Sequence, residues 1–456
     1  MTTKRRWIET DPAFYRSVML LAIPLMLQSI LSLSVTTVDS IMLGHMSEIS
    51  MSAANIANQP FNIVSGIIRG LAVGSGVMIA QYWGKQDKDS IKKILAIVLR
   101  INVVASLVCA IVSFAFPAQL MSLFTSSKEI AQAGVVYLRI ISLTYVLFAF
   151  SLTYQLALRS MEDARTPLFI NLITYGSNML LNYCLIFGKF GLPELGITGA
   201  AIGTLIARGI EIICYLIHML ALDKKLCMGL QDFWLKSKDL TRDLVRYGMP
   251  SLLSEMVFTI GLSMYTLIFG HLGTAATSAN TIVTMATRVS EVLQTGVSGA
   301  AAVLIGKTIG KGDMDKIRPR GAAFNVMTMG VAVLAGVIIF FGKDWLMSLY
   351  NVSAETYDLT MQMIMISVVM MPAIGYEFLY VCGTLVGGGD TNFIFWYTTI
   401  IMWCITMPLA FLGAFVFKWP VWVVFLILRA DYLIKSIVGY IRYRGNKWIT
   451  EVTVKK

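Results

Sequence analysis

The sequence predicts an all-α integral membrane protein with 12 transmembrane helices in two six-helix bundles. Three observations predict this fold class. Apolar residues fill 57% of the 456 positions and charged residues only 14%, whereas soluble domains carry about 25% charged residues. Twelve apolar runs reach the length of about 20 residues that a helix needs to cross the hydrocarbon. Four stretches of the first half of the chain recur in the second half.

The twelve runs follow one another along almost the whole chain. Their ranges are 15–44, 52–82, 94–116, 130–158, 168–188, 197–221, 248–270, 275–306, 321–342, 356–386, 393–415 and 420–440. Strand-length alternation is absent from them, and lipid offers no partner to an unpaired backbone group, so each run is expected to be a helix. The run behind the basic opening MTTKRRW is too long for a signal-peptide core, so we expect it to be retained as the first span.

The repeated stretches share one offset of 226 positions. The matches are Pro24 with Pro250, Gly44-His45 with Gly270-His271, residues 69–87 with 295–313, and residues 120–124 with 346–350. One shared offset, close to half the chain length, indicates an internal duplication. With six spans, an even number, both halves enter the membrane in the same orientation.

The duplication predicts the domain organisation. We expect an N-terminal six-helix lobe of residues 1–221, a charged linker of residues 222–247 on the cytoplasmic side, and a C-terminal lobe with a cytoplasmic tail, residues 248–456. A cleft between two such lobes is typical of transporters built from repeats.

The excess of positive charge, +11 in total, indicates how the chain is oriented in the membrane. With a cytoplasmic N-terminus, the segments that face outside hold only four of the 37 Lys and Arg residues, which are Lys128, Lys189, Lys343 and Lys418. This asymmetry follows the positive-inside rule and predicts a multi-pass protein of the cell membrane with both termini in the cytoplasm. We therefore expect the lipid bilayer as a partner and no nucleic acid.

The sequence contains no pattern of a catalytic or cofactor site. Its six cysteines are scattered without a CxxC pair, and its three histidines lack the i, i+4 spacing of a metal pair. Gly84-Lys85 and Gly310-Lys311 lack the spacing of a phosphate-binding loop. We expect no enzyme activity and no cofactor, with an ion gradient of Na+ or H+ as the source of any work.

Three acids within the runs have no Lys or Arg within four residues: Asp39, Glu255 and Glu377. A charge at the bilayer centre costs about 2.5–3.5 kcal/mol on insertion scales, so such residues are candidates for function. The remaining acids of interest have a base on the same helix face, which favours a structural role. These pairs are Arg208 with Glu211, Arg288 with Glu291, and Asp431 with Lys435.

An isolated carboxylate in lipid can exchange a proton, a sodium ion or a cationic ligand, because one positive species neutralises it at a time. Asp39 and Glu255 are therefore predicted to handle the coupling ion, and they are the metal ligands if that ion is Na+. The alternative is a plain hydrogen bond to a neighbouring helix.

Glu377 and the pair Asn178 and Asn182 are candidates for the substrate cavity. The two asparagines share a helix face at i, i+4, with interhelical hydrogen bonding as the alternative. With 27 Met and 11% aromatic residues in the chain, the rest of the cavity is expected to be apolar and adaptable.

An ordered set of motifs resembles the multidrug and toxic-compound extrusion (MATE) family. The motifs are LAIPLMLQS with VDSIMLGHMS, SMEDARTPLFINLITYGSNMLLNYCLIFG with LGITGAAIGT, and PSLLSEMVFTIGLSMY with GHLGTAATSAN. The resemblance covers about residues 15–448 and implies a twelve-helix, V-shaped exporter of lipophilic, often cationic drugs, driven by Na+ or H+.

The resemblance also implies roles for single residues. Asp39 matches the acid of the family's first helix and Glu255 that of the seventh helix, while Asn178 and Asn182 fall where some members hold an Asn and an Asp. Asn182 removes one carboxylate from that pattern. Gly375 aligns with an acid that many relatives carry in the tenth helix, and Glu377 follows two positions later.

The predicted function is therefore secondary active antiport: export of organic cations, drugs or other amphipathic compounds in exchange for Na+ or H+. A lipid or lipid-linked oligosaccharide flippase of the same superfamily is the alternative, and it would need a cation-rich cavity. A channel ranks third, because paired lobes favour alternating access. Each chain supplies both lobes, so we expect a monomer that binds a small-molecule substrate.

Overall fold

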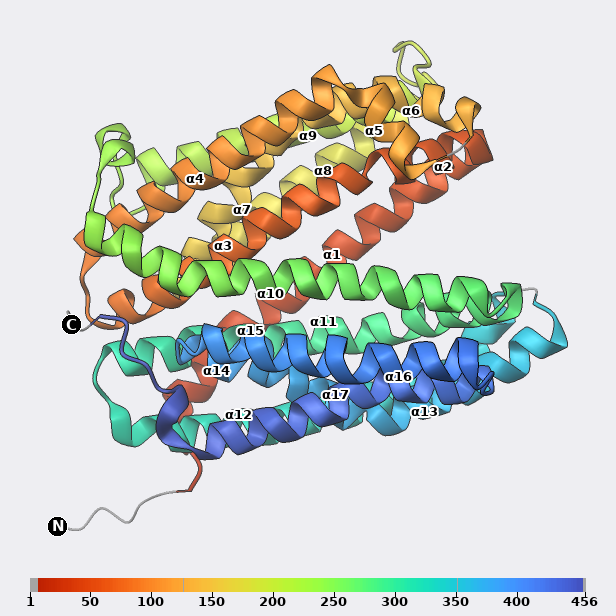
Figure 1. The fold of residues 1–456 in the computed structure, drawn as a ribbon. Helices are drawn as coiled ribbons and strands as arrows, with labels where there is room; N and C mark the ends of the chain where they lie inside the picture. The colour runs from red at the N-terminus through yellow and green to blue at the C-terminus, as the bar shows by residue number, and fades with distance from the viewer. Residues whose placement is uncertain (1–6, 126, 351, 454–456) are drawn as a thin grey trace. The chain divides into compact units, whose positions relative to one another are not determined.

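The computed structural model describes residues 7–125, 127–350 and 352–453, and these residues form helices without a β-strand (Figure 1). Each of the twelve predicted runs coincides with one helix or with consecutive helices. This confirms the all-α fold class. The basic residues 4–6 of the opening lie outside the described residues.

Most of the spans also satisfy a test of length and composition. Nine helices among the described residues are long and apolar enough to cross a membrane, and the bent pair α6 (Lys128–Ser142) and α7 (Thr144–Ser160), which meet at 47°, adds a tenth. The other two spans are α8 (Arg165–Phe187) and α17 (Val421–Arg444), with 23 and 24 residues. At about 1.5 Å per residue both are longer than the 30 Å hydrocarbon core.

The helices form two compact units. We call them the N-unit, Leu27–Ile79 with Asp87–Leu252, and the C-unit, Met1–Met26 with Ala80–Gln86 and Leu253–Lys456. The helices α1 (Pro12–Met46) and α10 (Lys238–His271) therefore each contribute residues to both units.

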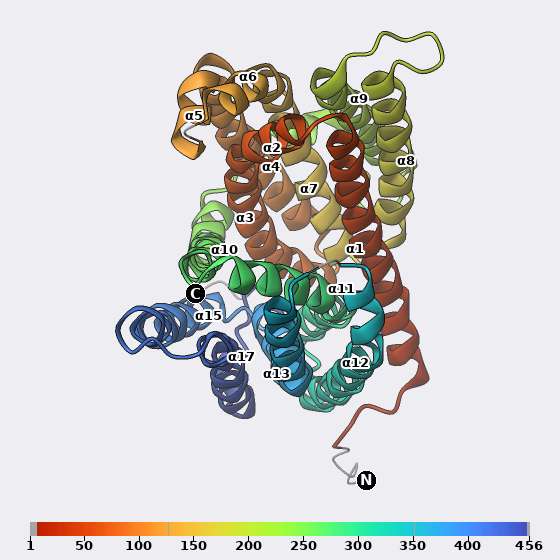
Figure 2. The same ribbon diagram turned by 90° about the vertical axis from the view of Figure 1, so that its right-hand side faces the viewer.

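In the N-unit, α8 packs beside α9, and α4 beside α7 (Figure 2). Its core includes the fully buried Leu138 and Tyr145. Besides parts of α1 and α10 and the helices already given, the N-unit contains α2 (Glu48–Ala57), most of α3 (Gln59–Gly84), α4 (Lys88–Ala115), α5 (Pro117–Phe124), α9 (Gly196–Ile217), η1 (His218–Leu222) and η2 (Leu230–Trp234).

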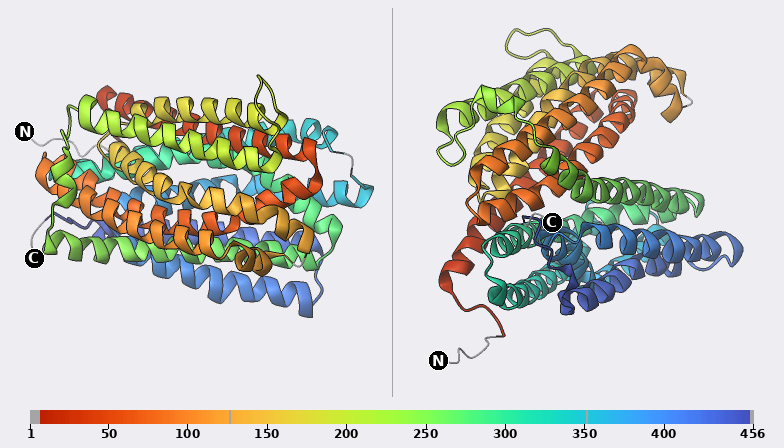
Figure 3. Two further views of the ribbon diagram at one scale, coloured as in Figure 1. Left: turned by 90° about the horizontal axis from the view of Figure 1, so that it is seen from above. Right: turned by 60° about the vertical axis from the view of Figure 1, so that its left-hand side comes forward.

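In the C-unit, α11, α12 and α13 pack against one another, and α17 packs on α13 (Figure 2). Figure 3 shows the same ribbon from two further sides. Three of its elements, η3, η4 and η5, are π-helical, an irregularity that often marks a functional region. Its other elements are α11 (Thr274–Gly310), α12 (Met314–Ser348), α13 (Ala354–Leu379), η3 (Tyr380–Thr384), α14 (Leu385–Gly387), α15 (Thr391–Thr399), η4 (Ile400–Thr406), α16 (Met407–Phe411), η5 (Leu412–Val416) and η6 (Asn446–Trp448).

The seventh span begins earlier than the sequence predicted. α10 starts at Lys238, so the end of the predicted linker is helical and continuous with the span. Ser237 caps this start, because its Oγ accepts a hydrogen bond from the backbone N–H of Leu240 at 3.4 Å. Oppositely charged residues then alternate along the first turns, and such spacing supports a helix.

Glycines at matching positions of the two halves allow helix backbones to touch. A Cβ added to Gly84 in α3 would collide with the Lys307 carbonyl oxygen in α11, and one added to Gly310 would collide with the Gln81 carbonyl oxygen. At the offset of 226, Gly84 matches Gly310 and Gln81 matches Lys307. The two contacts are therefore reciprocal, as a duplicated fold requires.

A second reciprocal contact involves α1 and α10. Gly70 of α3 lies against Leu252 of α10 within the N-unit, and Gly296 of α11 lies against Met26 of α1 within the C-unit. Gly70 matches Gly296 and Leu252 matches Met26 at the same offset. Met26 and Leu252 are also the residues at which α1 and α10 pass from one unit to the other. The duplication seen in the sequence thus extends to the packing.

Replacing Gly310 by Ala is expected to lower the free energy of unfolding by about 1–3 kcal/mol, because the new methyl group meets backbone atoms that have little freedom to move. Gly330→Ala is the matched control, since a Cβ there has no neighbour within 4 Å. Thermal unfolding of the purified protein in detergent measures both. Equal transition temperatures for the two variants would contradict the close approach of α3 and α11.

Candidate functional site

Asp39 lies in α1 and is half-buried in the N-unit. Its Oδ1 accepts a hydrogen bond from Asn182 Nδ2 of α8 at 2.8 Å. The same nitrogen donates to Asn178 Oδ1 at 3.3 Å, and Asn178 Nδ2 donates to Thr204 Oγ1 of α9 at 3.2 Å. Three of the predicted site residues, together with Thr204, thus form one hydrogen-bonded chain across three helices.

Within this hydrogen-bonded series, Asp39 accepts its hydrogen bond from a neutral amide. A hydrogen bond to an ionised oxygen is stronger than one between neutral groups, but it leaves the net charge of the site at −1. Asn182 is 1% exposed, and its Oδ1 has no hydrogen-bond partner among the described residues. Gly203 of α9 makes room for this oxygen, because a Cβ there would collide with it.

A cavity of about 460 Å³ opens beside Asp39. Asp39, Asn178 and Thr204 line it, together with residues of α2, α3 and α6. Asn182 lies behind this wall, so its position agrees with the alternative of an interhelical hydrogen bond, whereas Asn178 takes part in both. Asp39 is the only acid among the lining residues.

The sequence analysis missed a polar face that lines the same cavity. Asn55, Asn58 and Asn62 contribute to the wall from α2, α3 and the turn between them. Their spacing of i, i+3 and i+7 is the signal that would have identified them. Asn58 Nδ2 also donates to Tyr137 Oη of α6 at 3.3 Å.

The residue types that line this cavity differ from the Met-rich composition of the chain on which the expectation rested. Most lining residues are Ser, Thr, Asn, Gln or Tyr, and Met51 is the only methionine among them. The composition of the whole chain did not predict this wall, because most Met and aromatic side chains pack in cores or on outer helix faces.

The three predicted ion pairs are present. Arg208 Nη1 lies 2.6 Å from Glu211 Oε2, Arg288 Nη1 lies 3.1 Å from Glu291 Oε2, and Lys435 Nζ lies 2.6 Å from Asp431 Oδ2. Arg208 also lines the cavity beside Asp39 and is the only cation there. Because Glu211 pairs with it, Arg208 does not give the cavity a net positive charge.

Glu255 lies in the part of α10 that belongs to the C-unit and is half-buried. It follows Pro250 by five positions, and its backbone carbonyl accepts a hydrogen bond from Thr259 Oγ1 at 2.8 Å. Glu255 therefore does not share the N-unit cavity of Asp39. The two acids predicted to act together are contributed by different units.

Glu377 is buried in α13 with an exposed fraction of 5%. Asp431 and Lys435 of α17 are the charges that act on it, and Thr406 Oγ1 donates to Asp431 Oδ1 at 3.3 Å. Two acids and one base thus lie together in this buried cluster. The irregular segment η3 begins at Tyr380, so α13 is regular between Gly375 and Glu377 and the two residues face different directions.

Within the described ranges, no group of three or more His, Cys, Asp or Glu side chains is placed to hold a metal ion. Among the residues that line the cavity beside Asp39, the other side-chain oxygens belong to amides and hydroxyls.

Comparison with known proteins identifies a family whose model matches this chain. The family model described as MatE matches the chain twice, over residues 24–184 and 250–412. The two matches begin 226 positions apart, as the internal repeat does.

Two curated relatives match over nearly their full length. The probable multidrug resistance protein NorM of Thermotoga maritima is 25% identical over 450 residues, which is 96% of this chain and 94% of the relative. An uncharacterized transporter of Bacillus subtilis, YisQ, is 24% identical over 93% of both chains.

Solved structures share the fold. A crystal structure of MATE in complex with MaL6 has a TM-score of 0.86 at 18% identity and covers 97% of this chain and 98% of its own. A MOP superfamily transporter from Pyrococcus furiosus has a TM-score of 0.85 at 18% identity and covers 100% of both chains.

Replacing Lys435 by Met is expected to lower the free energy of unfolding by about 3–5 kcal/mol, because Asp431 and Glu377 would stay buried without their cation. Lys316→Met is the control: its pair with Asp313 is exposed, so its loss should cost at most about 1 kcal/mol. Unfolding by heat or denaturant in detergent measures both. Adding Asp431→Asn to Lys435→Met should recover part of the loss, and a double variant no more stable than the single one would contradict the electrostatic cause.

Proposed function

Because the chain belongs to the MatE family of multidrug and toxic-compound extrusion transporters, we propose that it is a secondary active antiporter. In this proposal it exports organic cations or other amphipathic compounds in exchange for Na+ or H+. The single observation that carries the proposal is the half-buried carboxylate of Asp39 at the wall of a cavity, where its hydrogen-bond partner is the neutral amide of Asn182.

The chemistry of coupling follows from this carboxylate. One negative charge in a low-dielectric wall is stabilised by one positive species at a time, so a cationic substrate and the coupling ion compete for it. An exchange results if each species favours a different access state, since a ligand shifts an equilibrium only by its differential affinity. Glu255 supplies the second acid, in the C-unit.

The arrangement around Asp39 favours a proton at this position. A proton needs only one carboxylate oxygen, whereas hard cations collect several oxygen ligands. The Asn182 amide presents its nitrogen to Asp39, and Asn178 Oδ1 already accepts from that nitrogen. Binding of Na+ would require these amides to turn. The transport experiment below tests H+ and Na+ separately.

A flippase for lipid-linked anions is not favoured. Such a substrate carries negative headgroups and needs several uncompensated cations in the cavity. Among the residues that line the cavity beside Asp39, Arg208 is the only cation, and Glu211 neutralises it.

The proposal locates the transporter in the cell membrane with both termini in the cytoplasm, because the Lys and Arg residues concentrate on that side of the predicted topology. It treats the chain as a monomer with a small-molecule substrate, since the duplication already provides two lobes within one chain.

Asp39→Asn and Glu255→Gln are each expected to slow drug or dye movement in everted vesicles under an imposed gradient. A lost coupling energy of about 1–3 kcal/mol corresponds to roughly 5- to 150-fold. Imposing H+ and Na+ gradients separately identifies the coupling ion. Asp344→Asn, at a side chain that is 66% exposed, is the control. Full transport by both site variants would remove these residues from the mechanism, and movement of a labelled lipid without drug movement would favour the flippase.

Gly203→Ala is expected to slow transport without touching a charged group, because its methyl group would push Asn182 away from Asp39. Gly209→Ala on the same helix is the matched control, since a Cβ there has no neighbour within 4 Å. Size-exclusion profiles and transition temperatures establish that both variants are folded. Equal transport by folded Gly203→Ala and Gly209→Ala would contradict a positioning role for Asn182.

A further inference from the structure

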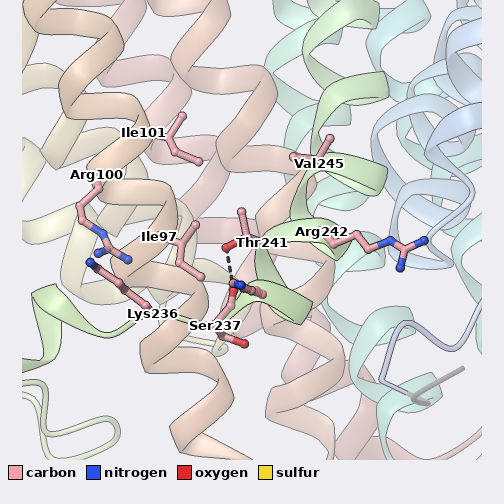
Figure 4. A pocket seen from close by; sticks show the side chains of 9 residues that line it. Ile97, Arg100, Ile101, Lys236, Ser237, Thr241, Arg242 and Val245 are labelled. Atoms are coloured by element: carbon pink, nitrogen blue, oxygen red, sulfur yellow. Dashed lines mark hydrogen bonds between the residues drawn. The ribbon is translucent and has the colours of Figure 1, made fainter.

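A second cavity of the N-unit, of about 660 Å³, lies between α4 and the start of α10 (Figure 4). Four of its lining side chains are cationic and no lining residue is acidic. The cations are Arg100 of α4, Lys236 before α10, and Lys238 and Arg242 in the first turns of α10. Asp239 and Asp243 stand on the same turns of α10 but do not line the cavity, and a group of lining cations attracts an anion.

Arg100 is the fixed member of this group. Its Nε donates to the Ala96 carbonyl at 3.2 Å, and its Nη2 donates to the Leu235 carbonyl. These two bonds orient the guanidinium and use two of its five N–H donors. The head groups of Arg100 and Lys236 lie together on one side of the cavity, and Arg242 extends to the other side (Figure 4).

The start of α10 adds to the positive potential. Ser237 and Lys238 line the cavity and stand at the first turn of this 34-residue helix. A helix N-terminus carries about half a positive charge and favours a negative group beside it. The helix dipole of α10 and the four cationic side chains thus both attract a negative group to the cavity.

The cavity continues into an apolar surface along α4. Ile97 is buried in the lining, and Ile101, Val104, Val108 and Ile111 follow at spacings of three and four residues with exposed fractions of 37%, 60%, 56% and 58%. Such spacing places them on one helix face. From Ile97 to Ile111 this face is about 21 Å long at 1.5 Å per residue, which exceeds the roughly 15 Å depth of one leaflet of the hydrocarbon core.

We propose that this cavity binds the phosphate headgroup of an anionic phospholipid, with an acyl chain along the apolar face of α4. The cations hold the headgroup oxygens through charge-assisted hydrogen bonds, while Ile101, Val104 and Val108 contact the chain. Basic pockets beside transmembrane helices recognise lipid headgroups in this way. The site is separate from the Asp39 cavity and does not depend on the proposed antiport.

The apolar face of α4 favours a phospholipid over free phosphate as the ligand. A soluble anion would use only the cations, and the exposed aliphatic row that leads away from them would have no role in binding it. A phospholipid uses both features at once, because its charged and apolar parts are joined in the same order as those of the site.

The test measures binding of phosphatidylglycerol to the full-length protein in detergent by native mass spectrometry. The variant Lys236→Gln/Lys238→Gln/Arg242→Gln removes three exposed or partly exposed charges and keeps Arg100, which orders the linker. We expect its dissociation constant to rise by at least about tenfold, since each basic residue near a membrane surface contributes appreciably to binding an anionic lipid. Lys311→Gln, at an exposed residue elsewhere, should leave binding unchanged.

Two further arms identify the ligand. Phosphatidylcholine, which has no net charge, and phosphatidylglycerol with six-carbon chains should both bind less tightly than long-chain phosphatidylglycerol. Unchanged phosphatidylglycerol binding by the triple variant, or equal binding of phosphatidylcholine, would overturn the proposal. Displacement of the lipid by millimolar inorganic phosphate would assign the cavity to a soluble anion and would also overturn it.

Discussion

A polar side chain that this fold carries into the bilayer gains most from a partner within the protein, because lipid supplies neither donors nor acceptors. That constraint explains the hydrogen-bonded chain from Asp39 through Asn182 and Asn178 to Thr204. It also explains the buried pair of Asp431 and Lys435. Polar groups placed by this requirement hold neighbouring helices together and lie where a transported ion can use them.

The two units satisfy the constraint with different chemistry. In the N-unit the partners of Asp39 are neutral, so its negative charge remains available to a positive solute. In the C-unit the ammonium group of Lys435 pairs with Asp431 and also acts on Glu377. The duplication does not extend to these groups, since Asp39 matches Tyr265 and Glu255 matches Ser29. Repetition preserved the helical framework while the ionisable residues diverged.

The framework itself depends on close backbone contacts. Gly84 and Gly310 let α3 and α11 touch, and Gly70 and Gly296 admit α10 and α1 in the same reciprocal manner. Without a hydrophobic driving force between helices in lipid, such small-residue contacts supply much of the packing. Pro24 and Pro250 each stand two positions before the residue at which α1 or α10 leaves one unit for the other. A helix interrupted by proline at that point is suited to serve both units.

The amino-acid sequence by itself determined the twelve spans, the duplication and the three ion pairs, because each depends on hydropathy, on an offset or on spacing within one helix. It also showed that Asp39, Glu255 and Glu377 have no Lys or Arg within four positions. Only the tertiary structure decided which of these groups meet. Asn182 reaches Asp39 across 143 positions, the Asn55 to Asn62 face completes their cavity, and Lys435 acts on Glu377 from another helix. Such pairings depend on how helices pack and rotate against one another, and the periodicity of a single helix carries no information about its neighbours.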